Sequence, residues 1–143
     1  MTTATDYETD FYQWTQQQAA LLRQGRLSRI DAANLAEEVE SMGNSNRWAL
    51  ESFLSNVIMH LLKWKYQPER RCASWKMTIR NGRIQIEKRL KNSPSLRPKL
   101  PEMIAGEYLP AREDAADETG LPLTTFPEQC EFSIEEITGD YWP

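Results

Sequence analysis

The chain has little cysteine and histidine, and it has no long hydrophobic run. Its 143 residues include two cysteines and one histidine. Cys72 and Cys130 have no CxxC or Cys/His spacing, so we expect neither a zinc site nor a structural disulfide. No apolar run approaches the roughly 20 residues that span a bilayer, and the segment from Thr2 to Asp10 lacks the basic and apolar regions of a signal peptide. We therefore expect a cytoplasmic protein that does not bind a membrane.

The length and composition fit one domain. A chain of this length can bury roughly 70% of the surface that it exposes when unfolded. Apolar residues make up 40% of the chain and charged residues 27%, as in ordinary soluble domains. We expect a single helical domain over residues 1–143, in which residues 120–143 form an irregular C-terminal wrap.

Charge is divided along the chain. Residues 63–99 hold twelve Lys and Arg residues against two acids, for a net charge of about +10. Residues 100–143 hold eleven acids against Arg112 alone. This division fits a nucleic-acid surface, a docking site for an acidic partner, or two halves of one fold that attract each other. The basic segment is a binding surface only if the acidic C-terminal third leaves it exposed.

Apolar residues recur at helical spacing through most of the chain, and no segment shows convincing two-residue alternation. Helices are expected over 10–25, from Ser28 or Asp31 to Gly43, over 45–66, over 74–91, from Ser95 onward, and briefly over 133–136. Gly43 either ends the second helix or is a weak point in a longer one. Pro110 either kinks or splits the fifth helix. The pattern predicts an all-α, compact, single-domain bundle of about five helices with an extended C-terminal segment carrying one short helix.

Two local details accompany these helices. The second helix is expected to carry Leu35, Val39 and Met42 on its inward face. The spacing of Ser133 and Glu136 is typical of a capping box at the start of the last, short helix.

His60, the only histidine, is the natural candidate for acid–base chemistry near neutral pH. It lies roughly 90° from the centre of the apolar face of the helix over 45–66, on the flank shared with Phe53 and Trp64. This position fits both a packed structural histidine and a ligand or catalyst.

Glu37, Glu38 and Glu40 form a carboxylate cluster, and hard cations prefer such oxygen ligands. The next helices offer only Glu51 and Glu87 as companions. We therefore expect a solvated acidic face rather than a metal site, and we expect no cofactor.

Arg83 places a cation close to the apolar stripe of the helix over 74–91. A buried guanidinium needs a partner, and breaking a buried ion pair typically costs about 3 to 5 kcal/mol. Glu38 lies between Leu35 and Met42 on the inward side of the second helix. We therefore predict a structural ion pair between Glu38 and Arg83.

Lys and Arg residues alternate with Trp64, Tyr66 and Trp75 in the basic segment. Cations between aromatic rings suit a surface that binds phosphates and stacks bases. The helical spacing also places Trp64 and Trp75 on apolar faces, which favours a role in the core. The candidates for external binding are Lys63, Arg70, Arg71, Lys76 and Arg80. Pairing of these cations with the acidic C-terminal third is the alternative.

Several motifs occur in one order along nearly the whole chain. They are DFYQWT at 10–15, NLAEEVESMG at 34–43, HLLKWKYQP at 60–68, Ser74-Trp75, SPSL at 93–96, Tyr108 with Ala111-Arg112, ETGL at 118–121 and Phe126-Pro127. In these motifs the chain resembles the bacterial domain-of-unknown-function family number twenty-nine. The resemblance implies an all-helical, cytoplasmic bacterial protein and brings no established activity. It draws attention to the family-like positions Glu38, His60, Arg71, Trp75, Arg83 and Arg112.

Charge is divided along the chain, and the sequence shows no recognisable group of catalytic residues. These two observations favour a non-enzymatic interaction or regulatory module that binds a protein partner or nucleic acid through a charged face. The alternative is a nucleotide or RNA hydrolase. In that mechanism His60 would be the general acid or base, Glu38 a base or metal ligand, and Arg71 or Arg83 a clamp for phosphate. A third interpretation is a structural subunit that folds fully only in a homo-oligomer.

Overall fold

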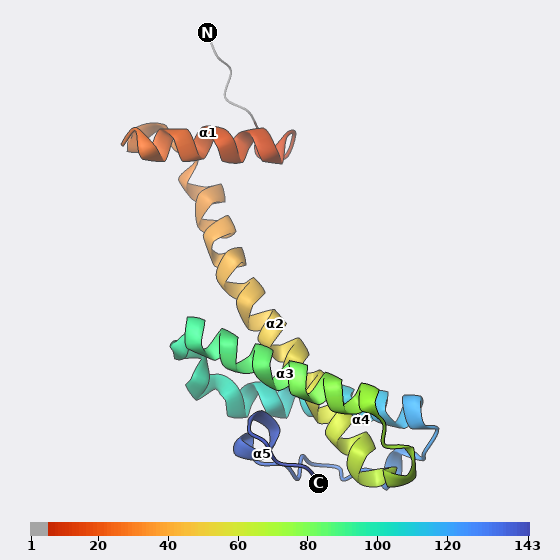
Figure 1. Ribbon diagram of the computed structural model, residues 1–143. Coiled ribbons are helices and arrows are strands. Elements are labelled where there is room, and N and C mark those ends of the chain that lie inside the picture. The colour runs from red at the N-terminus through yellow and green to blue at the C-terminus, as the bar shows by residue number, and fades with distance from the viewer. Residues whose placement is uncertain (1–5) are drawn as a thin grey trace. The chain divides into compact units, whose positions relative to one another are not determined.

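The computed structural model describes residues 6–143, and these residues form helices and no strand (Figure 1). The helices are α1 (Phe11–Arg23), α2 (Ala32–Tyr66), α3 (Ala73–Asn92), α4 (Leu100–Thr119) and α5 (Ile134–Thr138). Short 3-10 turns lie at Leu27–Arg29, Pro68–Arg70, Pro94–Lys99 and Leu123–Thr125. The all-α prediction is confirmed. None of these helices combines the length and the apolar character that crossing a bilayer requires.

The second and third helices expected from the sequence are one helix. α2 runs for 35 residues through Gly43 without a break. A glycine inside a helix destabilises the helix by roughly 1 kcal/mol relative to alanine. The helical turns before and after the glycine can offset this cost. Gly43 is therefore a weak point in a longer helix, which was one of the two alternatives.

Two compact units make up the chain, one up to Ser45 and one over Asn46–Pro143, and their boundary falls within α2. Each is described by itself below. The expectation of a single domain over residues 1–143 stays a prediction.

The first unit contains α1 and the start of α2. Asp10 caps α1 through a hydrogen bond from the Gln13 backbone N–H to its side chain, at 3.0 Å. Trp14 is buried and donates from Nε1 to Asp31 Oδ2 at 3.1 Å. Asp31 also accepts from the Asn34 backbone at 3.3 Å, so one carboxylate joins the two helices.

Two side chains of this unit are not where the sequence analysis put them. Val39 and Met42 are 65% and 72% exposed, so the prediction that they face inward is wrong, whereas Leu35 is half-buried. Periodicity identifies the apolar face of a helix, but it does not show whether another segment covers that face.

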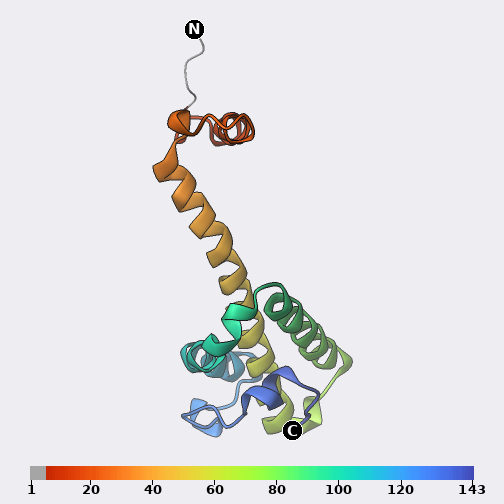
Figure 2. The same ribbon diagram turned by 90° about the vertical axis from the view of Figure 1, so that its left-hand side faces the viewer.

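The second unit is built around the C-terminal half of α2. Figure 2 shows this half of α2 between α3 and α4, with the segment after Gly120 crossing beside them. One apolar core joins these elements. Its members include Leu54, Val57, Ile58 and Leu61 of α2, Ile79, Ile86 and Leu90 of α3, Met103, Tyr108 and Ala111 of α4, and Phe126, Phe132 and Ile137 of the following segment.

α3 approaches α2 closely at Gly82. A Cβ atom built on Gly82 would overlap Cγ2 of Val57, which is fully buried. Only a glycine lets the two helices pack at this distance. The contact lies on the buried face of α3, which also carries Ile79, Ile86 and Leu90.

The helix expected from Ser95 onward begins later than predicted. The 3-10 turn over Pro94–Lys99 precedes α4, so the α-helix itself begins at Leu100 rather than near Ser95. Pro110 lies inside α4, which continues to Thr119. Gly120, with φ of 73°, ends it.

The segment after Gly120 ends in α5, which begins with the predicted capping box. The Glu136 backbone N–H donates to Ser133 Oγ at 3.1 Å, and the Ser133 N–H donates to Glu136 Oε1 at 2.9 Å. α5 packs against α3, and its Ile137 is fully buried.

Candidate functional site

α3 presents a mixed basic and apolar surface to solvent. Its buried residues are Ile79, Gly82, Arg83, Ile86 and Leu90. The exposed residues grouped here lie within about 120° of one another on the helix, with Lys76 at the edge next to Arg83. We call Lys76, Met77, Arg80, Ile84 and Lys88 the α3 surface; all five are exposed.

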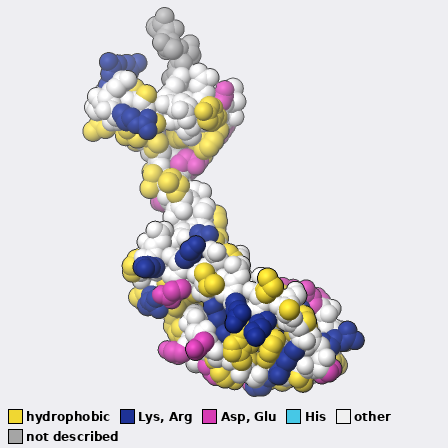
Figure 3. Space-filling model, in the orientation of Figure 1, with side chains coloured by type: hydrophobic (Ala, Val, Ile, Leu, Met, Phe, Trp, Pro, Cys, Tyr) yellow, Lys and Arg dark blue, Asp and Glu magenta, His cyan; other side chains and the backbone are white. Residues whose placement is uncertain are grey.

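The cations of the α3 surface have no partner among residues 6–143. Lys76, Arg80 and Lys88 make no side-chain hydrogen bond or ion pair in this part of the chain. Glu87, the acid nearest to them in α3, pairs with Arg97 at 3.4 Å. Figure 3 shows Lys and Arg side chains interspersed with hydrophobic ones over the region where Figure 1 places α3.

The acidic C-terminal third forms ion pairs with few of the cations in residues 63–99. In the described part of the chain, two ion pairs link residues 63–99 to it: Lys63 to Glu118 at 3.3 Å, and Lys65 to Glu131 at 2.9 Å. Most of the basic segment is therefore not neutralised within the molecule.

Besides its core side chains, the C-terminal segment is held by hydrogen bonds to its backbone carbonyl oxygens. Tyr108 donates its hydroxyl to the Pro127 carbonyl at 2.5 Å, and Arg112 donates from Nη2 to the Phe126 carbonyl at 2.9 Å. Burial is the largest of the effects that raise the pKa of Tyr108 to about 12, so its phenol stays protonated and can donate at neutral pH. Neutral carbonyls accept these bonds, and the carboxylate of Glu131 adds contacts to Lys65 at 2.9 Å and to the Tyr66 hydroxyl at 2.8 Å.

Arg83 has partners that the sequence analysis did not name. It is 8% exposed, which confirms that this cation faces inward. Its Nε donates to the Ile137 carbonyl at 3.0 Å, and its Nη2 donates to the carbonyls of Glu136 at 2.8 Å and Tyr141 at 2.6 Å. All three acceptors are main-chain oxygens, and they lie in α5 or in the tail that follows it.

Glu38, the partner predicted for Arg83, has a different contact in the first unit. Its Oε1 accepts a hydrogen bond from the Tyr7 hydroxyl. This bond, followed by burial, raises the pKa of Tyr7 to about 12. The structure thus gives each member of the predicted ion pair partners of its own.

Arg71 and Arg83 lie at the two ends of a row of aromatic rings. The guanidinium carbon of Arg71 is 4.9 Å from the centroid of a Trp64 ring, and Trp64 is 4.9 Å from Trp142. Arg83 lies 5.3 Å from the Trp142 centroid. Such cation–π contacts contribute about 0.5 to 2 kcal/mol each. The row therefore helps to hold the C-terminal tail against α2 and α3.

The predicted binding residues divide into engaged and free cations. Lys63 is buried, and its Nζ lies 4.7 Å above the Trp75 ring. Arg71 donates to the carbonyls of Trp64 and Pro143 at 2.8 and 3.2 Å. Arg70, Lys76 and Arg80 are exposed. Arg71 is exposed as well, so Lys63 is the buried one of the five candidates, and Arg70, Lys76 and Arg80 are exposed without a side-chain partner among residues 6–143.

His60 lies beside Lys63 in α2. Its Nδ1 is 2.8 Å from the Asn56 carbonyl oxygen, and because that oxygen only accepts, Nδ1 carries the proton. Burial lowers the pKa of His60, so the neutral form is favoured near pH 7. Glu118 of α4, which pairs with Lys63, opposes this effect in part.

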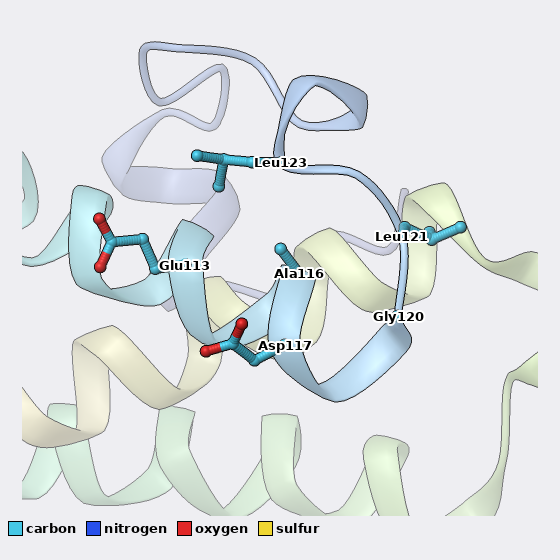
Figure 4. Close-up of a pocket in the computed structure, with 6 residues that line it drawn as sticks. All are labelled: Glu113, Ala116, Asp117, Gly120, Leu121 and Leu123. Atoms are coloured by element: carbon cyan, nitrogen blue, oxygen red, sulfur yellow. The ribbon is translucent and has the colours of Figure 1, made fainter.

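A pocket of ≈ 530 Å³ lies at the C-terminal end of α4 (Figure 4). Glu113 and Asp117, one turn apart, supply its carboxylates, and Leu121 and Leu123 come from the loop that follows Gly120. Within residues 6–143 no three His, Cys, Asp or Glu side chains are grouped as metal ligands. Two neighbouring carboxylates on a helix are a solvated acidic rim, and we assign them no chemistry.

Sequence reasoning missed Trp142 and the exposed Met77 and Ile84. A tryptophan within a polar tail is a signal that the tail must contact an apolar surface, because so large a ring is rarely left in water. No comparable signal in the sequence shows that Met77 and Ile84 are exposed, because apolar residues are common at any position of an amphipathic helix.

Comparison with known proteins identifies the family to which the chain belongs. Neither a curated protein nor a solved structure matches the chain significantly. The family model described as domain of unknown function DUF29 matches residues 7–142. That match covers nearly all of the sequence, and the chain therefore belongs to the DUF29 family.

Proposed function

We propose that the protein is a non-enzymatic binding module that holds an acidic protein partner on the α3 surface. The observation that carries this proposal is the exposure of Met77 (68%) and Ile84 (57%) among the unpaired cations Lys76, Arg80 and Lys88. A helix face that mixes apolar and basic side chains suits an amphipathic acidic segment, whose apolar residues gain from burial and whose carboxylates find cations.

An acidic protein fits this surface better than a single-stranded nucleic acid does. Base stacking needs free aromatic faces. Trp64 lies between Arg71 and Trp142, and Trp75 lies under the ammonium of Lys63. The hydrophobic side chains that remain exposed on α3 are the aliphatic Met77 and Ile84, which match apolar side chains rather than bases.

The environments of the hydrolase candidates also favour binding. The Nε and Nη2 atoms of Arg83 are used on carbonyl oxygens, and Glu38 accepts from Tyr7. A general base must be free for substrate, which Glu38 is not, and Arg83 has only Nη1 left, one donor group instead of the two-pronged contact typical of a phosphate clamp. We also propose that the module acts in the cytoplasm of a bacterium, which is what the family resemblance implies.

The test is affinity purification from the native cell at low salt, with protein and nucleic acid both identified in the eluate. The wild type is compared with the double variant Lys76→Glu/Lys88→Glu. The matched control is Arg26→Glu/Arg29→Glu, which makes the same change in charge at exposed positions of the first unit.

We expect an acidic protein that binds the wild type and the control directly when purified, and that binds the α3 variant at least tenfold more weakly. Equal binding to all three proteins would place the interface elsewhere. Recovery of nucleic acid alone, lost on nuclease treatment, would overturn the proposal in favour of the polyanion alternative.

A further inference from the structure

We propose that a pocket between α3 and residues 139–142 is the anchor site for a carboxylate side chain of the partner. The pocket has a volume of ≈ 450 Å³ and is lined by Arg80, Arg83, Ile84, Gly139, Asp140 and Trp142. We call it the anchor pocket. The inference rests on the proposed function, because Arg80 and Ile84 belong to both the pocket and the α3 surface.

One nitrogen of Arg83 remains for a ligand. Nε and Nη2 are hydrogen-bonded to carbonyl oxygens, whereas Nη1 makes no hydrogen bond. Among the described residues, Arg89 Nε is the only side-chain nitrogen or oxygen that is both fully buried and unpaired. Nη1 of Arg83 therefore reaches solvent, although the side chain as a whole is 8% exposed. Since Arg83 lines the anchor pocket, this is where an anion can approach it.

The charge of Arg83 is desolvated without being neutralised. Its acceptors are neutral carbonyls, and it forms no ion pair with any residue of the described chain. Burial lowers the pKa of Arg83, and the nearby Asp140 offsets this only in part. A buried cation with hydrogen-bonding capacity left over gains more from an incoming anion than an exposed one, because water screens it less.

The remaining walls select the kind of anion. Ile84 and Trp142 are apolar, and Arg80 adds a second, exposed cation. Asp140 limits the net charge of the pocket to about +1 if all three charged groups are ionised. A single carboxylate attached to an apolar stem fits these walls, as in an Asp or Glu side chain of an amphipathic segment. A phosphate dianion would meet repulsion from Asp140 and would leave the apolar walls unused.

The pocket is tested by NMR with phenylacetate as the probe, on the full chain. The indole N–H of Trp142 and the Nε–H of Arg83 are followed during titration. The neutral phenylacetamide and inorganic phosphate serve as comparison ligands. The variants are Arg80→Gln and Asp140→Asn, with Lys76→Glu as a control outside the pocket.

We expect saturable shifts of both signals with phenylacetate, and at least tenfold weaker binding of phenylacetamide. Arg80→Gln should weaken binding of phenylacetate threefold or more, and Asp140→Asn should strengthen it by a similar factor, because it removes a competing carboxylate. Lys76→Glu should leave these shifts nearly unchanged. Equal binding of the acid and the amide, or tighter binding of phosphate, would overturn the assignment of a carboxylate site.

This experiment separates the two proposals. If phenylacetate binds as expected but the acidic partner is insensitive to Lys76→Glu/Lys88→Glu, the anchor pocket stands and the proposed function fails. If the partner binding depends on the α3 surface but the Trp142 and Arg83 signals do not respond to phenylacetate, only the anchor pocket is refuted.

Discussion

The guanidinium carbon of Arg83 lies 5.3 Å from the ring centroid of Trp142, so a buried cation of α3 contacts the tail that follows α5. The same guanidinium binds carbonyl oxygens of Glu136, Ile137 and Tyr141. Through Trp142 the contact continues to Trp64 of α2. Arg83 and Trp142 together therefore link a tail that has little regular structure of its own to α3 and α2.

Replacing Arg83 by methionine should destabilise the second unit. The change keeps an unbranched side chain but leaves three carbonyl oxygens without their donor, and we expect a loss of about 2 to 4 kcal/mol in the free energy of unfolding. Urea denaturation followed by tryptophan fluorescence measures the loss. Arg80→Met, at an exposed position of the same helix, should change stability by less than about 0.5 kcal/mol. Similar effects of both substitutions would contradict the role given to Arg83.

Two glycine-to-alanine substitutions should have opposite effects. Gly82→Ala places a methyl group against the buried Val57, and overpacking of this kind typically costs about 1 to 3 kcal/mol. Gly106, inside α4, has nothing within 4 Å of the added Cβ, so Gly106→Ala should stabilise by about 0.5 to 1 kcal/mol through helix propensity. Thermal unfolding of both variants is the measurement. Stabilisation by Gly82→Ala would show that α3 does not pack closely on α2 there.

His60 should make stability depend on pH. Burial lowers its pKa in the folded state below the ordinary value of 6.5, so the unfolded chain binds the proton more readily. The contribution is complete above pH 6.5 and is lost as pH falls through the folded pKa. The midpoint of urea unfolding should therefore decrease between about pH 7 and pH 5, before most carboxylates titrate. In His60→Gln the decrease in this midpoint between pH 7 and pH 5 should be smaller. If the midpoint depends on pH as strongly as in the wild type, other groups cause the decrease.

The Tyr7 hydroxyl should lose its proton only at unusually high pH, because it donates a hydrogen bond to Glu38. The pKa values of Tyr7, Tyr66 and Tyr108 are each raised to about 12, and the hydrogen bond to Glu38 is the largest cause for Tyr7. Glu38→Gln should move the pKa of Tyr7 back toward its ordinary value of 10 and leave Tyr66 and Tyr108 unchanged. An absorbance titration of phenolate, with Tyr7→Phe to assign the signal, checks this. No shift in the Glu38 variant would show that the Tyr7–Glu38 bond is not formed in solution.

Local features of the fold were predictable from the sequence. Asp10 and Ser133 cap helices because their side chains bond to backbone N–H groups three residues on, and Gly120 ends α4 because it adopts a positive φ. The continuation of α2 through Gly43 was left open, since a single glycine weakens a helix without breaking it.

The candidate site was predictable only in part. The inward position of Arg83 follows from helical spacing, but its acceptors lie 53 to 58 residues further along the chain and are backbone atoms. Every residue has a carbonyl oxygen, so no residue type marks these acceptors in the sequence; the ion pair between Glu38 and Arg83 stays a prediction. The burial of Lys63 was missed for a related reason, because its pairing with Glu118 joins α2 to the far end of α4.

By itself the sequence determined the helical class, the capping box at Ser133 and the division of charge, because each depends on neighbours within a few positions or on composition. Only the tertiary structure decided which cations are free. Lys63, Arg71 and Arg83 are engaged by Trp75, Trp64 and the C-terminal carbonyls, whereas Lys76, Arg80 and Lys88 remain exposed. The physical reason is that packing between elements far apart in the sequence, such as Gly82 of α3 against Val57 of α2, buries the apolar side of α3 and leaves the side that carries Lys76, Arg80 and Lys88 in solvent.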